Sequence, residues 1–173
     1  MNNDRTLSKD STIYNYRLLR RVHHKAVHHY AYWLLTVLAW IYALLHIELL
    51  SFAVVLFGIP LVHAVFLHTL HRTKEGQAPK AWRWSFRMPW FGYTPGNYIA
   101  LAKVLRLHNQ LFWIVLLILA CFYPWLSTDV LLFAMFYHVW LLLPRLMIIF
   151  IFRKYKSSGL LKINPHDTSC YTQ

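Results

Sequence analysis

Two long apolar blocks, at residues 30–70 and 110–152, dominate the chain, and polar residues interrupt each block once. His46-Ile47-Glu48 divides the first block, and the segment from Tyr123 to Asp129 divides the second. Because a helix needs about 20 apolar residues to cross a bilayer, each block has room for two crossings. The pattern therefore predicts an all-α integral membrane fold with four transmembrane helices in two hairpins. The predicted spans cover residues 30–46, 49–70, 110–126 and 130–152.

The basic residues flank these spans on one side. Of the 18 Lys and Arg residues, Arg145 alone lies inside a predicted span, and neither predicted outer turn contains one. Cytoplasmic loops of membrane proteins carry an excess of Lys and Arg, so both the N- and C-termini are predicted to be cytoplasmic. The expected location is the inner (cytoplasmic) membrane of a bacterium, crossed several times.

Outside the hairpins, the pattern predicts three basic segments. They are a cytoplasmic arm over residues 1–29, a basic and aromatic loop with an amphipathic helix over 71–109, and a cytoplasmic tail over 153–173. In the arm, a surface helix is predicted from Ser11 or Thr12, because Leu18, Val22 and Ala26 share one face and basic residues occupy the other. A second helix is predicted to begin at Tyr98, and the tail after Lys156 is predicted to be mobile.

The composition narrows the class of partner. A formal net charge of +12 would indicate nucleic acid in a soluble protein, but here the basic residues flank spans in a chain that is 58% hydrophobic. Nucleic acid is therefore not an expected partner. Anionic lipid headgroups are expected, together with a membrane protein partner or a second copy of the chain. The two cysteines, Cys121 and Cys170, do not form a disulfide framework.

Arg145 is the first candidate functional residue, because an arginine inside a bilayer is costly unless it has a role or a partner. Its side chain can snorkel to the interface, hydrogen-bond internally, or hold an anion or a partner's carboxylate. No Asp or Glu occurs in a predicted span. His63 and Arg145 are expected at the same depth, and with His138 they can line a polar cavity. The alternative for either histidine is a neutral, hydrogen-bonded core residue.

A string of aromatic and basic residues at 82–93 supplies a second candidate site. Alternating indole rings and guanidinium groups suit the headgroup layer of a membrane, so the segment can be a simple anchor. Trp and Arg are also the residues that binding surfaces use most. The candidate residues for binding a partner or lipid are Trp82, Arg83, Trp84, Arg87 and Trp90.

The 11 histidines raise the question of a metal or haem site. His24 and His28 share a helical face at i and i+4, but they lack the Glu of a His-Glu-x-x-His motif, and neither a metal site nor a cofactor is predicted. Catalytic triads, paired carboxylates and phosphate-binding glycine loops are also missing, so the sequence does not favour an enzyme. The function expected is a small accessory, assembly or regulatory membrane protein. The alternatives are a histidine-based haem or metal redox protein and a small oligomeric anion transporter.

Overall fold

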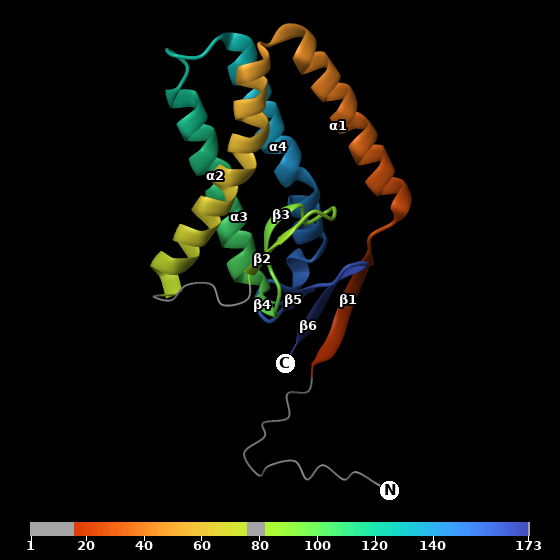
Figure 1. The fold of residues 1–173 in the computed structure, drawn as a ribbon. Coiled ribbons are helices and arrows are strands. Elements are labelled where there is room, and N and C mark those ends of the chain that lie inside the picture. The colour runs from red at the N-terminus through yellow and green to blue at the C-terminus, as the bar shows by residue number, and fades with distance from the viewer. Residues whose placement is uncertain (1–15, 76–81, 173) are drawn as a thin grey trace, which may run out of the picture.

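The computed structural model describes residues 16–75 and 82–172, and helices make up most of it (Figure 1). The four helices are α1 (Ala26–His46), α2 (Leu49–Glu75), α3 (Leu101–Cys121) and α4 (Thr128–Ile151). The four predicted helices are confirmed, and the break at residues 46–48 lies where the sequence placed it. Helix α3 runs without a break from Leu101, near the helix start predicted at Tyr98, through most of the span predicted at residues 110–126.

Three of the helices are long and apolar enough to cross a membrane, by length and composition. These stretches are Leu49–Thr73, Leu101–Cys121 and Thr128–Ile151. The remaining helix, α1, has 21 residues but carries His28, His29 and Tyr30 near its N-terminal end, which lower its hydropathy. In Figure 1, α1 meets the other helices near the α1–α2 turn and leans away from them toward its N-terminal end.

A four-stranded antiparallel sheet closes one end of the helices, in the order β1-β6-β5-β4 (Figure 1). Its strands are β1 (Arg17–His23), β4 (Ile99–Ala100), β5 (Leu160–Ile163) and β6 (Asp167–Thr172). A short 3₁₀ helix, Arg153–Tyr155, leads from α4 toward β5. Gly159 is required in this connection, because a Cβ there would lie 2.5 Å from the Tyr155 carbonyl oxygen.

The sheet corrects four predictions. The all-α assignment is wrong, and the surface helix predicted from Ser11 or Thr12 is wrong within the described residues, because residues 17–23 form β1. The helix predicted from Tyr98 begins at Leu101, after β4. The mobile tail is also wrong: β6 pairs with both β1 and β5, and Thr168, Ser169 and Cys170 are fully buried. In each case, a strand partner more than 50 residues away in sequence decides the local structure.

A second, two-stranded sheet is the hairpin of β2 (Trp82–Ser85) and β3 (Gly92–Pro95). Its tip points toward α1 and α4 (Figure 1). Phe91 at the tip contacts Trp33 of α1 edge to face, and Tyr93 packs near His68 of α2. The hairpin therefore fills the space where α1 diverges from the other helices.

Two apolar cores hold these parts together. The larger core lies among α2, α3 and α4 and includes Leu67, Leu111 and Leu142, which are fully buried. The smaller core joins the lower ends of α3 and α4 to the sheet through Leu101, Phe152 and Leu161. Helix α1 is attached to α4 by polar contacts: the Tyr32 hydroxyl donates to the Trp140 carbonyl at 3.1 Å, and Trp140 Nε1 donates to Thr36 Oγ1 at 2.9 Å.

Candidate binding sites beside and beneath the aromatic hairpin

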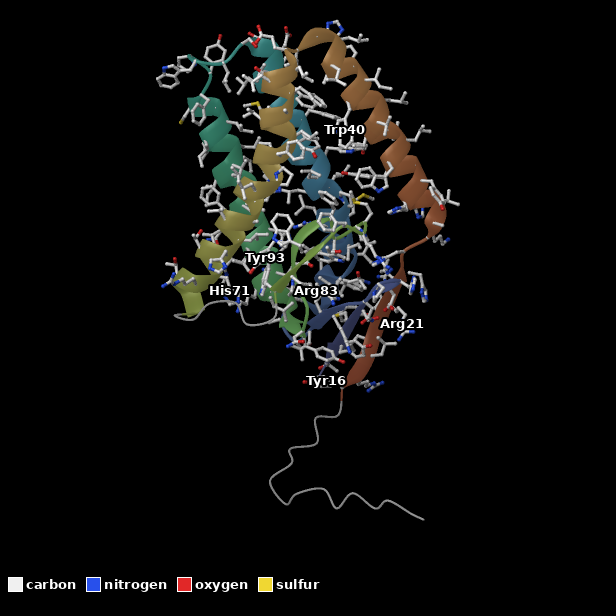
Figure 2. The ribbon with its side chains drawn as sticks, viewed as in Figure 1. Tyr16, Arg21, Trp40, His71, Arg83 and Tyr93 are labelled. Carbon is white, nitrogen blue, oxygen red and sulfur yellow. The ribbon has the colours of Figure 1, made fainter. Side chains whose placement is uncertain are left out.

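The β2–β3 hairpin separates the predicted aromatic and basic residues into exposed and buried sets. Arg83, Trp84 and Arg87 are exposed, whereas Trp82 is half-buried against His71 and Tyr93. Figure 2 shows Arg83 and Tyr93 on the hairpin and His71 near the end of α2. Trp90 is 1% exposed, and its Nε1 donates to Thr168 Oγ1 at 2.8 Å. Trp90 therefore anchors the hairpin to β6 and does not belong to its outer surface.

Phe86, which was not among the candidate binding residues predicted from the sequence, is 73% exposed at the hairpin tip. It continues the alternation of Trp82 and Trp84, and this period of two is the signal that could have identified the strand and its aromatic face. The exposed basic residues Arg83 and Arg87 occupy the intervening positions. The hairpin thus carries aromatic and cationic side chains in alternation along its exposed part.

A groove with a volume of about 470 Å³ lies between the hairpin and the helices. Trp84, Phe86, Met88 and Phe91 line it from the hairpin. Helix α1 contributes Tyr32, Trp33, Thr36 and Trp40, helix α2 contributes Leu56, Phe57, Pro60 and Leu61, and α4 contributes Tyr137 and Leu141. Phe57 is 73% and Leu61 58% exposed, so the groove opens between α1 and α2 onto the outside of the helices. Its walls are almost entirely apolar.

Arg145 lies in the interior of the molecule. Its side chain is 2% exposed, and its Nε and Nη1 atoms have no hydrogen-bond partner among the residues that the structure describes. A snorkelling arginine places its guanidinium group in water or among headgroups, and Arg145 does neither in this structure. A Cβ at Gly92 would lie 2.8 Å from Arg145 Nη2, and Gly92 has a φ of +100°, so the backbone of β3 covers the guanidinium closely.

His63 and His138, which were predicted to share a polar region, are in direct contact. His63 Nε2 lies 2.7 Å from His138 Nδ1, and His138 Nε2 lies 3.2 Å from the Phe112 carbonyl oxygen. A carbonyl only accepts, so His138 carries its hydrogen on Nε2 and accepts from His63 at Nδ1. The pair is buried and satisfied internally, as expected for core histidines. Arg145 is within electrostatic range of His63 but is not hydrogen-bonded to it.

His108 of α3 is an interior residue that the sequence analysis did not select. It is 1% exposed, and its Nδ1 lies 2.9 Å from the Val104 carbonyl oxygen, while its Nε2 has no partner among the described residues. The predicted third span began at residue 110, so His108 was assigned to the cytoplasmic helix before it. Recognising that the apolar core extends down α3 past residue 110 would have placed this histidine in the interior, within the electrostatic range of Arg145.

Thr168 connects the sheet to the hairpin and to the start of α1. Its hydroxyl accepts from Trp90 Nε1 and lies 2.8 Å from His24 Nε2. Because Trp90 can only donate, the hydroxyl hydrogen is free to point at the His24 nitrogen. Burial lowers the pKa of His24 from its usual 6.5, which favours the neutral ring that this arrangement needs.

Within residues 16–75 and 82–172, no three His, Cys, Asp or Glu side chains come close enough together to hold a metal ion. The predicted pairing of His24 and His28 does not arise on one helix, because His24 lies between β1 and α1. Comparison with protein-family models, curated proteins and solved structures found no match to this chain. Any functional assignment therefore depends on the geometry of the groove, the hairpin and the residues beneath them.

Proposed function

We propose that this chain is a four-span accessory or regulatory membrane protein that binds anionic lipid through the β2–β3 hairpin and the groove beside it. In this proposal both termini, the hairpin and the sheet lie on the cytoplasmic side of a bacterial inner membrane. The observation that carries the proposal is the groove itself, an apolar space of about 470 Å³ lined in part by the hairpin, on which Arg83 and Arg87 are exposed.

The outward face of α1 supports a fourth span. Its exposed side chains are predominantly apolar, which is unfavourable in water but suits lipid. These residues include Leu34, Leu35, Leu38, Ile41 and Leu45. At 1.5 Å per residue the helix is roughly 31 Å long, about the thickness of the hydrocarbon core. The pairing of β1 with β6 also keeps the segments before α1 and after α4 on the same side.

The hairpin and groove suit the two parts of a phospholipid. An acyl chain in the groove would contact Trp84 and Phe86 on the hairpin and Phe57 and Leu61 on α2. Because Arg83 alternates with Trp82 and Trp84 along β2, the hairpin presents an exposed guanidinium group on the face opposite these two indole rings. Guanidinium groups form strong, paired hydrogen bonds with phosphate, so Arg83 and Arg87 are placed to select an anionic headgroup.

The test is lipid retention by an Arg83→Gln/Arg87→Gln double variant, measured by native mass spectrometry after extraction in mild detergent. Arg153→Gln/Lys154→Gln is the matched control, since it removes the same charge from two exposed residues near the sheet. We expect the hairpin variant to lose most of its anionic lipid, and the control to retain it. A Leu61→Trp substitution, which fills the groove, should also reduce retention. Equal lipid content in all four proteins would refute the proposal.

A further inference from the structure

The Arg145 side chain has hydrogen-bonding capacity that the described residues do not use. Arginine remains protonated in proteins, so Nε and Nη1 both carry hydrogens. The side chain is 2% exposed, and neither atom has an acceptor within residues 16–75 and 82–172. A buried charge without a partner is strongly unfavourable. The site therefore needs an acceptor that the described part of the chain does not supply.

The described carboxylates whose side chains can be placed are far from this site or engaged elsewhere. Glu48 and Asp129 lie at the opposite end of the helices, next to the first residues of α2 and α4. Asp167 lies in β6, where its carboxylate contacts Arg21 at 3.4 Å. An anion is the acceptor that would satisfy these donors and also neutralise the buried charge.

His108 adds a second, complementary group. Its Nδ1 hydrogen is donated to the Val104 carbonyl oxygen at 2.9 Å, so Nε2 of the neutral ring is an acceptor without a donor. The side chain is 1% exposed and interacts electrostatically with Arg145. Together the two residues offer two donors from a cation and one acceptor from a neutral ring, all buried.

We propose that Arg145 and His108 bind an anion that contains both a phosphate group and a hydroxyl. An anionic oxygen accepts from Arg145 at Nε or at Nη1, which lie on different edges of the guanidinium group, and the hydroxyl donates to His108 Nε2. Hydrogen bonds between a guanidinium group and phosphate are charge-assisted and therefore strong. Protonated inorganic phosphate and a phospholipid with a glycerol headgroup both have this chemistry. The site is separate from the lipid surface proposed above, because Arg145 is buried beneath the hairpin that exposes Arg83 and Arg87.

The β2–β3 hairpin controls access to this site. The β3 backbone at Gly92 lies so close to Arg145 that a Cβ would be 2.8 Å from Nη2, so no side chain separates them. A phosphate group therefore reaches the guanidinium when the hairpin lifts away from α4. Trp90 ties the hairpin to Thr168 and also contacts the His108 ring edge to face, with centroids 6.0 Å apart. The movement thus also uncovers His108.

The experiment compares wild type with Arg145→Leu and Arg145→Lys, using Arg153→Leu as the control for loss of a nearby exposed cation. Thermal stability in neutral detergent is measured at pH 7 with inorganic phosphate and with sulfate, which is also tetrahedral and anionic but lacks a proton. A second arm measures retention of a phospholipid with a glycerol headgroup against the same lipid with a methyl-capped headgroup. Arg145→Lys covers the case in which the Leu variant does not fold.

We expect wild type and Arg153→Leu to prefer the hydroxyl-bearing ligand by about tenfold or more, as sites built to pair a hydroxyl do. Both Arg145 variants should lose this preference. If wild type and the Arg145 variants differ in their preference for phosphate over sulfate, the site binds the free anion. If they differ only in their preference between the two lipids, the site binds a lipid headgroup. If neither arm separates wild type from the Arg145 variants, or if sulfate equals phosphate and both lipids are retained equally, the proposal is wrong. Loss of lipid in Arg83→Gln/Arg87→Gln with this preference intact would show that the two sites are independent.

Discussion

Several buried polar residues in this protein form small hydrogen-bonded groups. His63 and His138 satisfy each other, and His138 also bonds the Phe112 carbonyl. The Thr168 hydroxyl accepts a hydrogen bond from Trp90 Nε1 and is also hydrogen-bonded to His24 Nε2. Such groups stabilise a fold only when every member has its partner, because an unpaired polar group in the interior costs about 1–3 kcal/mol. The consequence is that single changes in these groups should be more harmful than paired changes.

For the histidine pair, we expect His63→Leu and His138→Leu each to lower the free energy of unfolding by about 1–3 kcal/mol, since each leaves a buried partner unsatisfied. The double variant should be less destabilised than the sum of the two, because the second change removes the orphaned group. Detergent-based unfolding measures all three. His63→Leu combined with Thr69→Val, an exposed residue that bonds its own helix, should be additive. Strict additivity of the two histidine changes would contradict the pairing.

His24 makes the junction of β1 and α1 sensitive to acid. Its pKa is lowered in the folded protein, so the unfolded chain binds more protons below about pH 6.5. Its contribution to stability is therefore complete above that pH and is lost as the pH falls toward the lower folded value. We expect the free energy of unfolding of wild type to fall more between pH 7.5 and 5.5 than that of His24→Gln. The control is His28→Gln, which changes an exposed side chain and should lose as much stability as wild type. Equal losses in all three proteins would contradict this role.

The four-stranded sheet is the largest departure from the predicted fold, because its strands β1 and β6 hold both ends of the described chain together. In β6, Thr168 and Cys170 are fully buried, and Leu161 of β5 is fully buried beside them. Burial also raises the pKa of the Cys170 thiol, which further reduces its reactivity. Cys121, in contrast, is exposed. Thiol reactivity can therefore distinguish a paired strand from a mobile tail.

In a Cys121→Ser background, we expect a maleimide reagent to modify Cys170 only as fast as the sheet opens, and completely after denaturation. A Ser157→Cys/Cys170→Ser protein in the same background is the control, because Ser157 is exposed just before β5. It should react rapidly in the folded state. Rapid native labelling of Cys170 would mean that the tail is mobile and that β6 is not paired.

The elements that the sequence predicted correctly are those with a local cause. The apolar blocks predicted the four helices, and His46-Ile47-Glu48 predicted the first turn. Both features depend on residues that are neighbours in the sequence. The strands depend on distant partners: Arg17 pairs with Thr172, and Ile99 with Leu161. Leu18, Val22 and Ala26 satisfy a helical period equally well, so nothing local identifies β1.

The same distinction applies to the candidate sites. The predicted depths paired His63 with Arg145, with His138 nearer the middle of its span in the same polar cavity, whereas His63 contacts His138 directly. Arg145 was selected from its cost in a membrane. His108 was missed because the start of the third span was misplaced, and the burial of Trp90 follows from a contact with Thr168, 78 residues away. Composition identified the residues, but only the tertiary fold separates the surface of the hairpin from its anchor.

At the scale of the whole molecule, the proposals depend on whether α1 crosses the membrane. If it does, β1, the hairpin and the sheet share one side, and Arg83 and Arg87 meet lipid headgroups. If α1 lies on the opposite surface, its junction with β1 must be broken, since β1 is paired with β6 beyond α4. The side on which β1 lies relative to the α1–α2 turn decides between these arrangements.

The most direct measurement is labelling of single cysteines with a membrane-impermeant maleimide, in a Cys121→Ser/Cys170→Ser background. Leu18→Cys reports on β1, where the native side chain is 43% exposed, and Glu48→Cys and Ser127→Cys report on the two outer turns. We predict that Glu48→Cys and Ser127→Cys react in intact cells, whereas Leu18→Cys reacts only after permeabilisation. Labelling of Leu18→Cys in intact cells together with Glu48→Cys would show that α1 does not span the membrane and would contradict this account.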